Sequence, residues 1–324
     1  MKVFVVGASG SLGSRVVPQL IERGHEVVGA HSSPSSADRV RALGATPVRL
    51  DLLDPAAVRR AVLEAEPEAI VHEATSLSGV KLSKNLDASF VTTNRLRTEG
   101  IDTLIAVARE AGVTRLVAQS VAYPRYAREG GPVKTEDDPL DPAPVEGMTE
   151  TMAAVGYLDR AVTEAGGIAL RYGSIYGAPT DGLIEPVRKR QFPVVGDGGG
   201  ILSWIHLDDA ATATALAVER HGPAVFNVVD DDPAPVREWL PVLAEALGAK
   251  PPRHIPVWLA RMIAGEAAVL FGTDARGASN AKAKRELGWT LRYPSWRQGF
   301  FAGYASPGHA AAGHSRRGKL REVA

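Results

Sequence analysis

The stretch KVFVVGASGSLG, residues 2–13, decides the fold of this chain. A short β-branched and aromatic run leads into glycines at positions 7, 10 and 13, and the helical pattern SRVVPQLIERG follows at once. Glycines at a strand-to-helix junction allow a tight turn and the close approach of a pyrophosphate, while the helix N-terminus supplies free N–H groups. The stretch therefore predicts a strand, a dinucleotide-binding loop and a helix. A turn that merely needs glycine explains one of these glycines better than it explains three.

The alternation of strand and helix continues through the first half of the chain. Further strand patterns are EVVGAH, TPVRL, AIVHEA, RLVAQS and IALRYGS, at 26–31, 46–50, 69–74, 115–120 and 168–174. Such units in alternation indicate a parallel sheet covered by helices on both faces. Gly24 and Gly112, each just after a helical run, suit left-handed caps at helix C-termini. We predict an α/β fold of the Rossmann type, a doubly wound parallel sheet with a smaller C-terminal substrate-binding lobe.

The regular alternation ends in the second half, where turns mix with short helices. We predict a dinucleotide-binding Rossmann domain over residues 1–180, to which the chain returns at about 204–229. Residues 181–203 and 230–304 form the predicted substrate-binding lobe. The stretch 305–324 is small, polar and basic without apolar periodicity, so we predict a disordered tail there.

Bulk properties exclude several classes of function. Lys plus Arg and Asp plus Glu number 37 each among 324 residues, and no basic stripe marks a nucleic-acid partner. The chain has no cysteine for disulfides or thiolate chemistry, and its 8 histidines lack metal-ligand spacing. Its opening apolar run is too short for a signal peptide, and no run approaches the roughly 20 apolar residues of a membrane span. We expect a cytoplasmic protein with a small-molecule substrate and no metal, membrane or nucleic-acid partner.

The end of the second predicted strand, GAHSS, bears on the choice of dinucleotide. An acid there would accept hydrogen bonds from the ribose hydroxyls of NAD, whereas a basic residue would favour the extra phosphate of NADP. The sequence has neither. With no acid to repel a phosphate, and with His31, Ser32, Ser33 and Arg39 as donors, it favours NADP over NAD. Solvent-exposed serines in a turn are the alternative interpretation.

Several ordered motifs give the chain a family resemblance over about residues 1–300. After the glycine loop come Asp51-Leu52, His72-Glu73-Ala74, Asn94, LRYGSIYG at 170–177, WIHLDD at 204–209, FNV at 226–228 and LGW at 287–289. In this order they resemble the extended short-chain dehydrogenase/reductase family, the NAD(P)-dependent epimerases and dehydratases. The resemblance implies an NAD(P) cofactor held by Gly7, Ser9, Gly10, Ser11, Leu12, Gly13, His31, Ser32, Asp51, Leu52, Glu73, Ala74 and Asn94. It also implies that a homodimer can form, because family members often pair through their fourth and sixth helices.

The family's catalytic centre is only partly present. Ser120 ends the fifth predicted strand, where the family places a catalytic Ser or Thr that hydrogen-bonds a substrate oxygen; a serine capping a turn is the alternative. The family's proton donor is a Tyr four residues before a Lys that lowers the tyrosine pKa. No Tyr-x-x-x-Lys occurs in this chain. At the expected place, GMTETMAAVGYLDRAV, alignment gives either Met148 and Met152 or Thr151 and Val155, and neither pair can transfer protons.

Other side chains are candidates for the missing acid and for substrate selection. Tyr123, on the loop after the fifth strand, is the first choice, whereas Tyr176 matches a structural tyrosine and His206 a histidine that orders its loop. Family members that handle nucleotide sugars commonly carry an arginine just before the Ile-His-x-x-Asp motif, where a bidentate cation suits a diphosphate. Leu202 and Ser203 stand there in this chain, which disfavours such a sugar.

The predicted lobe contributes large apolar side chains that suit either a small apolar substrate or the lobe core. They are Trp204, Trp258, Met262, Phe271 and Trp296. Three functions stay open. The sequence favours an NAD(P)-dependent oxidoreductase of the epimerase/dehydratase type, with a non-standard acid/base, acting on a small apolar carbonyl or alcohol. The alternatives are a non-redox lyase, isomerase or cyclase on the same fold, and a non-catalytic NAD(P)-binding sensor.

Overall fold

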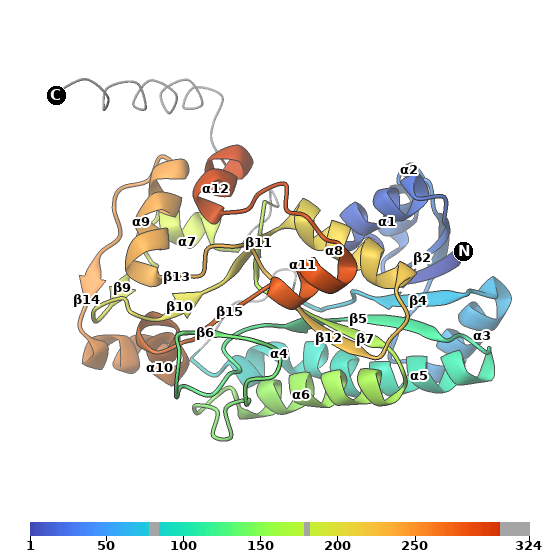
Figure 1. Cartoon of the computed structure of the whole chain (residues 1–324), viewed down its shortest axis with the longest axis horizontal. Helices are drawn as coiled ribbons and strands as arrows, with labels where there is room; N and C mark the ends of the chain where they lie inside the picture. Colours follow the sequence, from blue (N-terminus) through green and yellow to red (C-terminus); the bar gives the residue numbers. More distant parts are fainter. Residues whose placement is uncertain (78–83, 178–181, 305–324) are drawn as a thin grey trace.

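A computed structural model describes residues 1–77, 84–177 and 182–304, and the tail predicted at 305–324 lies outside the described residues. Its centre is a parallel sheet of seven strands in the order β12-β7-β5-β4-β1-β2-β3 (Figure 1). These strands are β1 (Lys2–Val6), β2 (Glu26–His31), β3 (Thr46–Arg49), β4 (Ala69–His72), β5 (Arg115–Val121), β7 (Ile168–Tyr172) and β12 (Ala224–Val228). The chain winds outward from β1 in both directions, which confirms the predicted doubly wound sheet.

Helices cover both faces of this sheet (Figure 1). One layer holds α1 (Gly13–Glu22), α2 (Ala37–Ala42), α8 (Leu207–Glu219) and α11 (Ala281–Leu287), and the other holds α3 (Pro55–Ala65), α4 (Leu86–Arg95), α5 (Ile101–Glu110) and α6 (Thr149–Glu164). Strand β1 contributes to both cores. Val3 and Val5 pack into the α1 and α8 layer, while Phe4 and Val6 pack into the α3, α5 and α6 layer. A strand buried on both faces needs apolar residues at successive positions, which this run supplies.

Local signals set the helix ends. Helix α3 begins where Asp54 accepts hydrogen bonds from the amides of Ala56 and Ala57, with Pro55 in the first turn. Gly24 and Gly112 have φ values of +82° and +71°, which confirms the left-handed turns predicted for them. Between α4 and α5 the chain forms a π-helical turn, η2 (Leu96–Gly100). Such turns shift the register of a helix and are common at functional sites.

The smaller lobe is built from short strands and helices around an aromatic core. Its elements are α7 (Ile184–Arg188), β9 (Val194–Val195), β10 (Ile201–Leu202), β13 (Ala234–Pro235), α9 (Val236–Ala246), β14 (His254–Ile255), α10 (Val257–Thr273) and α12 (Trp296–Tyr304). Trp204, Trp239, Trp296 and Phe300 are fully buried in it. Two further parallel pairs are β6 (Val133–Lys134) with β15 (Gly277–Ala278), and β8 (Ser174–Tyr176) with β11 (Trp204–His206).

The large apolar residues considered for a substrate wall have different positions. Trp204 and Trp296 belong to the lobe core, which confirms that alternative for these two residues. Trp258 and Met262 lie on α10 with 64% and 58% of their surface exposed. Phe271 packs edge-on against Tyr123, with the ring centroids 6.0 Å apart. Of this set, Phe271 therefore lies beside the loop that leaves β5.

Candidate functional site

The glycine loop between β1 and α1 has a shape that only glycine permits. Gly7 has φ +89°, and a Cβ there would lie 2.8 Å from the amide nitrogen of Ala74. A Cβ on Gly13 would lie 2.2 Å from the Gly7 carbonyl oxygen. Gly10 is exposed, and a Cβ there would meet the Gly7 oxygen at 3.2 Å. Gly7 and Gly13 thus pack too closely against neighbouring backbone for any side chain, whereas Gly10 is accessible to a ligand.

The start of α1 offers donors to an anion. Helix α1 has no side-chain cap, and within the described chain the backbone N–H groups of Ser11 and Leu12 find no acceptor. The amides of Gly7 and Ala8 instead bond to the Ala30 carbonyl, which holds the loop against the end of β2. Uncapped N–H groups at a helix N-terminus suit the pyrophosphate of a dinucleotide, so the residues present fit this cofactor.

The residues predicted for the adenosine end lie at the ends of β2 and β3. His31 is buried, with its Nδ1 3.0 Å from the Ser33 carbonyl oxygen, and Ser32 is exposed. Arg49 is exposed and stands in register with His31 on the neighbouring strand. Asp51 is exposed and accepts a hydrogen bond from the Leu53 amide. Leu52 is buried against Gly100 of the π-helical turn.

Glu73 contributes its backbone, not its carboxyl group, to the edge of the glycine loop. Its carbonyl carbon would lie 2.9 Å from a Cβ at Gly7, whereas its Oε1 accepts a hydrogen bond from the Tyr172 hydroxyl at 3.1 Å. That hydroxyl also lies 2.6 Å from Thr214 Oγ1 on α8. Burial raises the pKa of the Glu73 carboxyl to about 8. The group is therefore largely neutral at pH 7.

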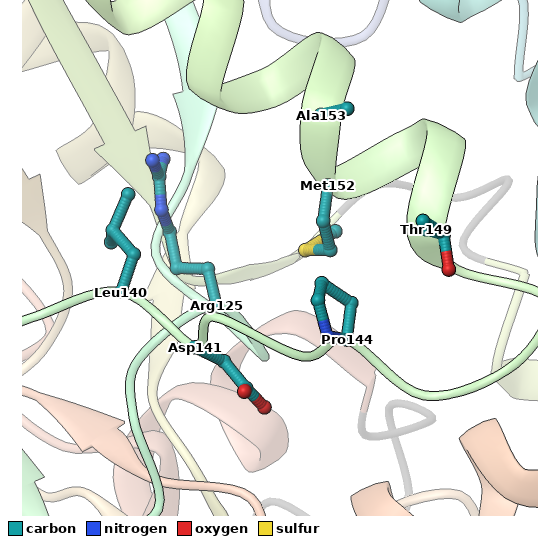
Figure 2. Close-up of a pocket in the computed structure, with 7 residues that line it drawn as sticks. All are labelled: Arg125, Leu140, Asp141, Pro144, Thr149, Met152 and Ala153. Atoms are coloured by element: carbon teal, nitrogen blue, oxygen red, sulfur yellow. The ribbon is translucent and has the colours of Figure 1, made fainter.

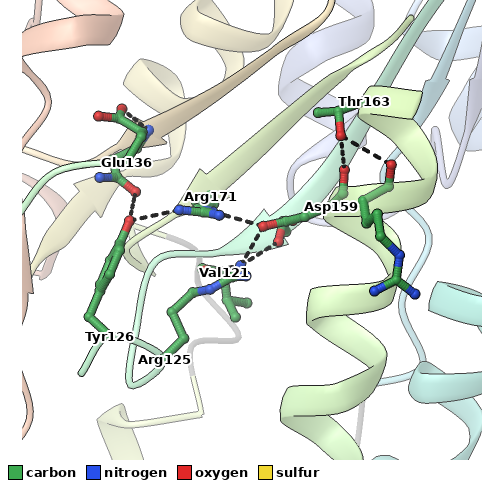
Figure 3. Close-up of polar contacts among 10 residues, drawn as sticks. Val121, Arg125, Tyr126, Glu136, Asp159, Thr163 and Arg171 are labelled. Atoms are coloured by element: carbon green, nitrogen blue, oxygen red, sulfur yellow. Dashed lines mark hydrogen bonds and ion pairs between the residues drawn. The ribbon is translucent and has the colours of Figure 1, made fainter. Parts of the chain in front are cut away.

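Ser120 is buried near the end of β5, and its partner is an arginine that the sequence did not reveal as a site residue. Arg125 Nη1 donates to Ser120 Oγ at 3.2 Å and to the Val121 carbonyl oxygen at 3.1 Å. The same atom lies 2.8 Å from Asp159 Oδ2 on α6 (Figure 3). Arg125 is only 4% exposed. It therefore ties the loop after β5 to both the predicted catalytic serine and α6.

A buried polar network continues from Asp159 across the sheet (Figure 3). Arg171 Nε donates to Asp159 Oδ2 at 2.8 Å, and Arg171 Nη1 donates to the Tyr126 hydroxyl at 3.0 Å. The Tyr126 hydroxyl donates in turn to Asn227 Oδ1 at 2.7 Å. Ser120, Arg171 and Asn227 are register partners on β5, β7 and β12. Their side chains therefore project on the same face of the sheet, toward α6.

Helix α6 places the two candidate pairs of the missing Tyr and Lys differently. Thr151 and Val155 are buried, and Thr151 Oγ1 accepts a hydrogen bond from Asn94 Nδ2 at 3.1 Å. Met148 packs into a small apolar cluster formed with residues of α4 and α10. Met152 is partly buried and belongs to the rim of that cluster. Neither pair brings a group that titrates near neutral pH.

Met152 also lines a cavity between α6 and the loop that follows β5. The cavity has a volume of about 230 Å³, and its walls are Arg125, Leu140, Asp141, Pro144, Thr149, Met152 and Ala153 (Figure 2). Most of this wall is apolar, with Arg125 and Asp141 as its charged members. Asp141 is engaged by Arg128, 3.3 Å away. The cavity therefore adjoins the arginine that holds Ser120.

The other candidate donors differ in their surroundings. The Tyr123 ring contacts Phe271 of the smaller lobe. Tyr176 is buried among aromatic rings, and burial raises its pKa far above the usual range, so it cannot serve as an acid near pH 7. His206 Nδ1 accepts the Asp208 amide at 3.1 Å and caps α8. Burial lowers the pKa of His206. His206 thus holds the start of a helix.

The doubly wound sheet and the glycine loop together define a dinucleotide-binding protein. Comparison with known proteins gives its family. The chain belongs to the NAD dependent epimerase/dehydratase family, whose model matches residues 3–228. This confirms the family resemblance. A "3-diazoavenalumate denitrifying reductase" from a Streptomyces species is 42% identical over 310 residues, covering 92% of this chain and 99% of the relative. A Stigmatella aurantiaca "4-hydroxy-2-methyl-3-oxo-4-farnesyl-3,4-dihydroquinoline-1-oxide ketoreductase" is 29% identical and covers 90% and 92%.

Solved structures agree on the fold. The Thermus thermophilus UDP-glucose 4-epimerase in complex with NAD superposes with a TM-score of 0.70 at 24% identity, covering 99% of this chain and 100% of that one. The protein is therefore an NAD(P)-dependent enzyme of the oxidoreductase or epimerase/dehydratase type. In the described part of the chain no group of three or more His, Cys, Asp or Glu could hold a metal ion. No described helix has the length and apolarity needed to cross a membrane.

Proposed function

We propose that this protein is an NAD(P)H-dependent reductase that replaces the diazo group of a small organic substrate with hydrogen and releases dinitrogen. The conversion is balanced by one hydride: R–N₂⁺ plus H⁻ gives R–H and N₂. The carbon–nitrogen bond breaks, its electron pair leaves with nitrogen, and the hydride pair forms the new carbon–hydrogen bond. The relative that is 42% identical over 92% of the chain is named as a denitrifying reductase of a diazo compound, which supports this proposal.

The composition of α6 is the observation that carries the proposal. Reduction of a ketone leaves an alkoxide that must receive a proton, and the family resemblance assigns that step to the Tyr and Lys of α6. Here the same helix presents Thr151 with Val155, or Met148 with Met152. Loss of dinitrogen leaves no alkoxide to protonate. A site with hydrogen-bond donors but no acid near neutral pH suits this reaction.

The cofactor would be held by the glycine loop and the ends of β2 to β4. When bound in its reduced form, the dinucleotide supplies the hydride. We propose Ser11 and Leu12 amides for the pyrophosphate, and His31, Ser32 and Arg49 for the 2′-phosphate of NADP. The register of Arg49 with His31 supports NADP over NAD, because it adds a cation where the sequence has no acid.

The surroundings of β10 and β11 argue against a nucleotide-diphosphate sugar. Leu202 and Ser203 occupy the place of the arginine that family members acting on such substrates commonly carry, and both are buried. Ser203 Oγ accepts a hydrogen bond from the Ala278 amide at 2.8 Å, so it is committed to the fold. We therefore propose a small substrate that lacks a diphosphate, and a homodimer that pairs through the layer of α4, α5 and α6.

A second candidate function is reduction of a carbonyl group with Tyr123 as the acid. The position of Tyr123 three residues after Ser120, and the 29% identical ketoreductase, favour it. Another relative, 29% identical over 77% of the chain, is the 2-alkyl-3-oxoalkanoate reductase of Stenotrophomonas maltophilia. This alternative predicts that the Tyr123 hydroxyl is essential.

One assay separates the two functions. The protein is mixed with NADPH or NADH and a ¹⁵N-labelled diazotised aminobenzoate, and labelled dinitrogen is measured by mass spectrometry alongside nicotinamide absorbance. We expect one N₂ per cofactor oxidised, above a protein-free control. We also expect Tyr123→Phe to retain more than about half of the turnover, because no proton is transferred to the substrate. Turnover of a 2-alkyl-3-oxo acid that is lost in Tyr123→Phe, without release of N₂, would establish the alternative.

A further inference from the structure

Two buried hydroxyl groups at the site have protons without an acceptor among the described residues. Ser120 Oγ accepts a hydrogen bond from Arg125, and Thr151 Oγ1 accepts one from Asn94. Ser120 and Thr151 are only 2% and 3% exposed. Neither hydroxyl donates to any residue that the structure describes. Because a hydroxyl carries one proton as well as its lone pairs, each can still donate one hydrogen bond.

Each hydroxyl is linked to a guanidinium by hydrogen bonds. Arg125 bonds Ser120 directly, whereas Arg97, on the π-helical turn, reaches Thr151 through Asn94. Arg97 Nη1 lies 3.2 Å from Asn94 Oδ1, and a guanidinium has only donors. The amide oxygen of Asn94 must therefore face Arg97, and its nitrogen must donate to Thr151. Both hydroxyls are thus fixed as acceptors from the protein and as donors toward a ligand.

Arg97 is a buried cation that forms no ion pair in the part of the chain that the structure describes. Arg97 is 9% exposed, and no acidic group among the described residues lies within ion-pair distance of it. Arg125 shares Asp159 with Arg171. Burial, and then the charge of Arg125, lower the pKa of Arg97 to about 10, so it remains charged at pH 7. A buried cation without a partner is costly, and an anion beside it relieves the cost.

The carboxylate of Asp87 does not fill this role. Its two oxygens accept hydrogen bonds from the amides of Glu150 and Thr151, at 3.2 and 2.8 Å. It therefore caps the first turn of α6 through backbone amides and does not bond the Thr151 hydroxyl. Among the described residues Arg97 therefore has no ion-pair partner, Asp87 included.

We propose that this cluster is an oxyanion-binding site, in which Ser120 and Thr151 donate hydrogen bonds to a carboxylate or phenolate of the substrate and Arg125 and Arg97 position them. The proposal rests on the proposed function and deepens it by naming the substrate class as an organic anion. An oxyanion supplies the missing acceptor for both hydroxyl protons and balances the buried charge. Because arginine stays protonated, the site recognises the negative charge of the substrate without transferring a proton to it.

Binding of simple anions tests the site without turnover. Isothermal titration of the protein loaded with NADP⁺ uses benzoate, 4-nitrophenolate and neutral benzamide as probes. We expect one of the two anions to bind at least about 10-fold more tightly than benzamide, and the tighter one distinguishes carboxylate from phenolate. Arg97→Met should weaken binding of that anion roughly 10- to 100-fold, because it removes the buried charge and the donor that orients Asn94 and Thr151, and should leave benzamide binding unchanged. Arg97→Lys should recover part of the loss.

Controls make the result specific. Arg95→Met removes an exposed arginine at the end of α4, next to the π-helical turn, where it pairs with Glu99. We expect this variant protein to bind all three probes as the wild type does. Equal wild-type affinity for the three probes, or an equal loss of all three in folded Arg97→Met, would overturn the site. If Arg97→Met does not fold, the same comparison on Arg97→Gln decides, because glutamine keeps a hydrogen-bond donor and removes the charge. Anion preference without N₂ release overturns the proposed function alone, whereas N₂ release without anion preference overturns this inference alone.

Discussion

Glu73 is a buried carboxyl group whose proton is linked to folding. Its pKa in the folded chain is about 8 against an ordinary value of 4.5, and burial is the main cause. Between these pH values the native protein holds a proton that the unfolded chain has released. The native state therefore binds more protons, and the free energy of unfolding falls as pH rises from 4.5 to 8. Above pH 8 both states are deprotonated and the slope ends.

Glu73→Gln should remove this dependence. The amide is neutral at every pH and its oxygen can still accept the Tyr172 hydrogen bond. We expect the variant to be more stable than the wild type at pH 8.5 by roughly 2–4 kcal/mol, with little difference at pH 5. Urea unfolding at both pH values measures the change. Parallel pH profiles for the two proteins would show that Glu73 is already ionised in the native state.

Arg97 and Arg125 could not be identified as site residues from the sequence alone. Arg125 lies in an irregular loop and Arg97 on a helix, and in a sequence both resemble ordinary solvated charges. Their burial arises from tertiary packing between α6, β5 and the π-helical turn. The position of Ser120 was predictable because it lies near the end of a strand at the expected edge of the sheet. Its partner was not, because no local pattern marks an arginine five residues later that folds back on it.

Helix α6 is the element where the two alignments of the missing Tyr and Lys can be compared. Thr151, Val155 and Asp159 recur every four residues and are all buried on one face, and Asp159 joins the arginine network. Met148 and Met152 lie toward α4, α10 and the cavity instead. The geometry favours Thr151 and Val155 as the replaced positions.

Replacing Thr151 by Tyr and Val155 by Lys should therefore restore proton transfer. General acid catalysis is worth about 10²- to 10⁴-fold, so we expect NADPH-dependent reduction of a 2-alkyl-3-oxo acid to rise at least about 10-fold above the wild type. The pH profile of the variant should also gain an alkaline limb from the new tyrosine. Met148→Tyr with Met152→Lys is the matched control. A gain in this control, and none in the first variant, would reverse the alignment.

The secondary-structure elements differed in how well they could be predicted from the sequence. Most strands of the main sheet were predictable because they are short apolar runs bounded by turn residues. The glycine loop was predictable because its spacing has a steric cause. The π-helical turn was not, since the apolar period through Leu96–Gly100 reads as continuous helix. The short strands of the smaller lobe have two or three residues each and pair across long separations, so no local period marks them.

The whole molecule presents α4, α5 and α6 as one outer layer (Figure 1), and the proposed homodimer pairs through it. On α6, Ala153 and Arg160 are exposed and Gly156 is half-buried; a Cβ at Gly156 would meet nothing within 4 Å. On α4, Val91 is 54% exposed. Small side chains on α6 allow a second copy of the layer to approach closely, and Val91 adds apolar area. We expect light scattering after size exclusion to give twice the mass of one chain.

Gly156→Trp tests that interface directly. A Cβ at Gly156 meets nothing within 4 Å, so we expect the monomer to accommodate an indole there, whereas a second copy of α6 packed on this face should not. We expect the variant to keep the circular dichroism spectrum of the wild type and to elute with the mass of a single chain. Gly182 also has open space around its Cβ position but lies outside this layer, so Gly182→Trp should remain a dimer. A dimeric Gly156→Trp protein would place the contact on another face, because an interface built on α6 cannot absorb a side chain of that volume at its centre.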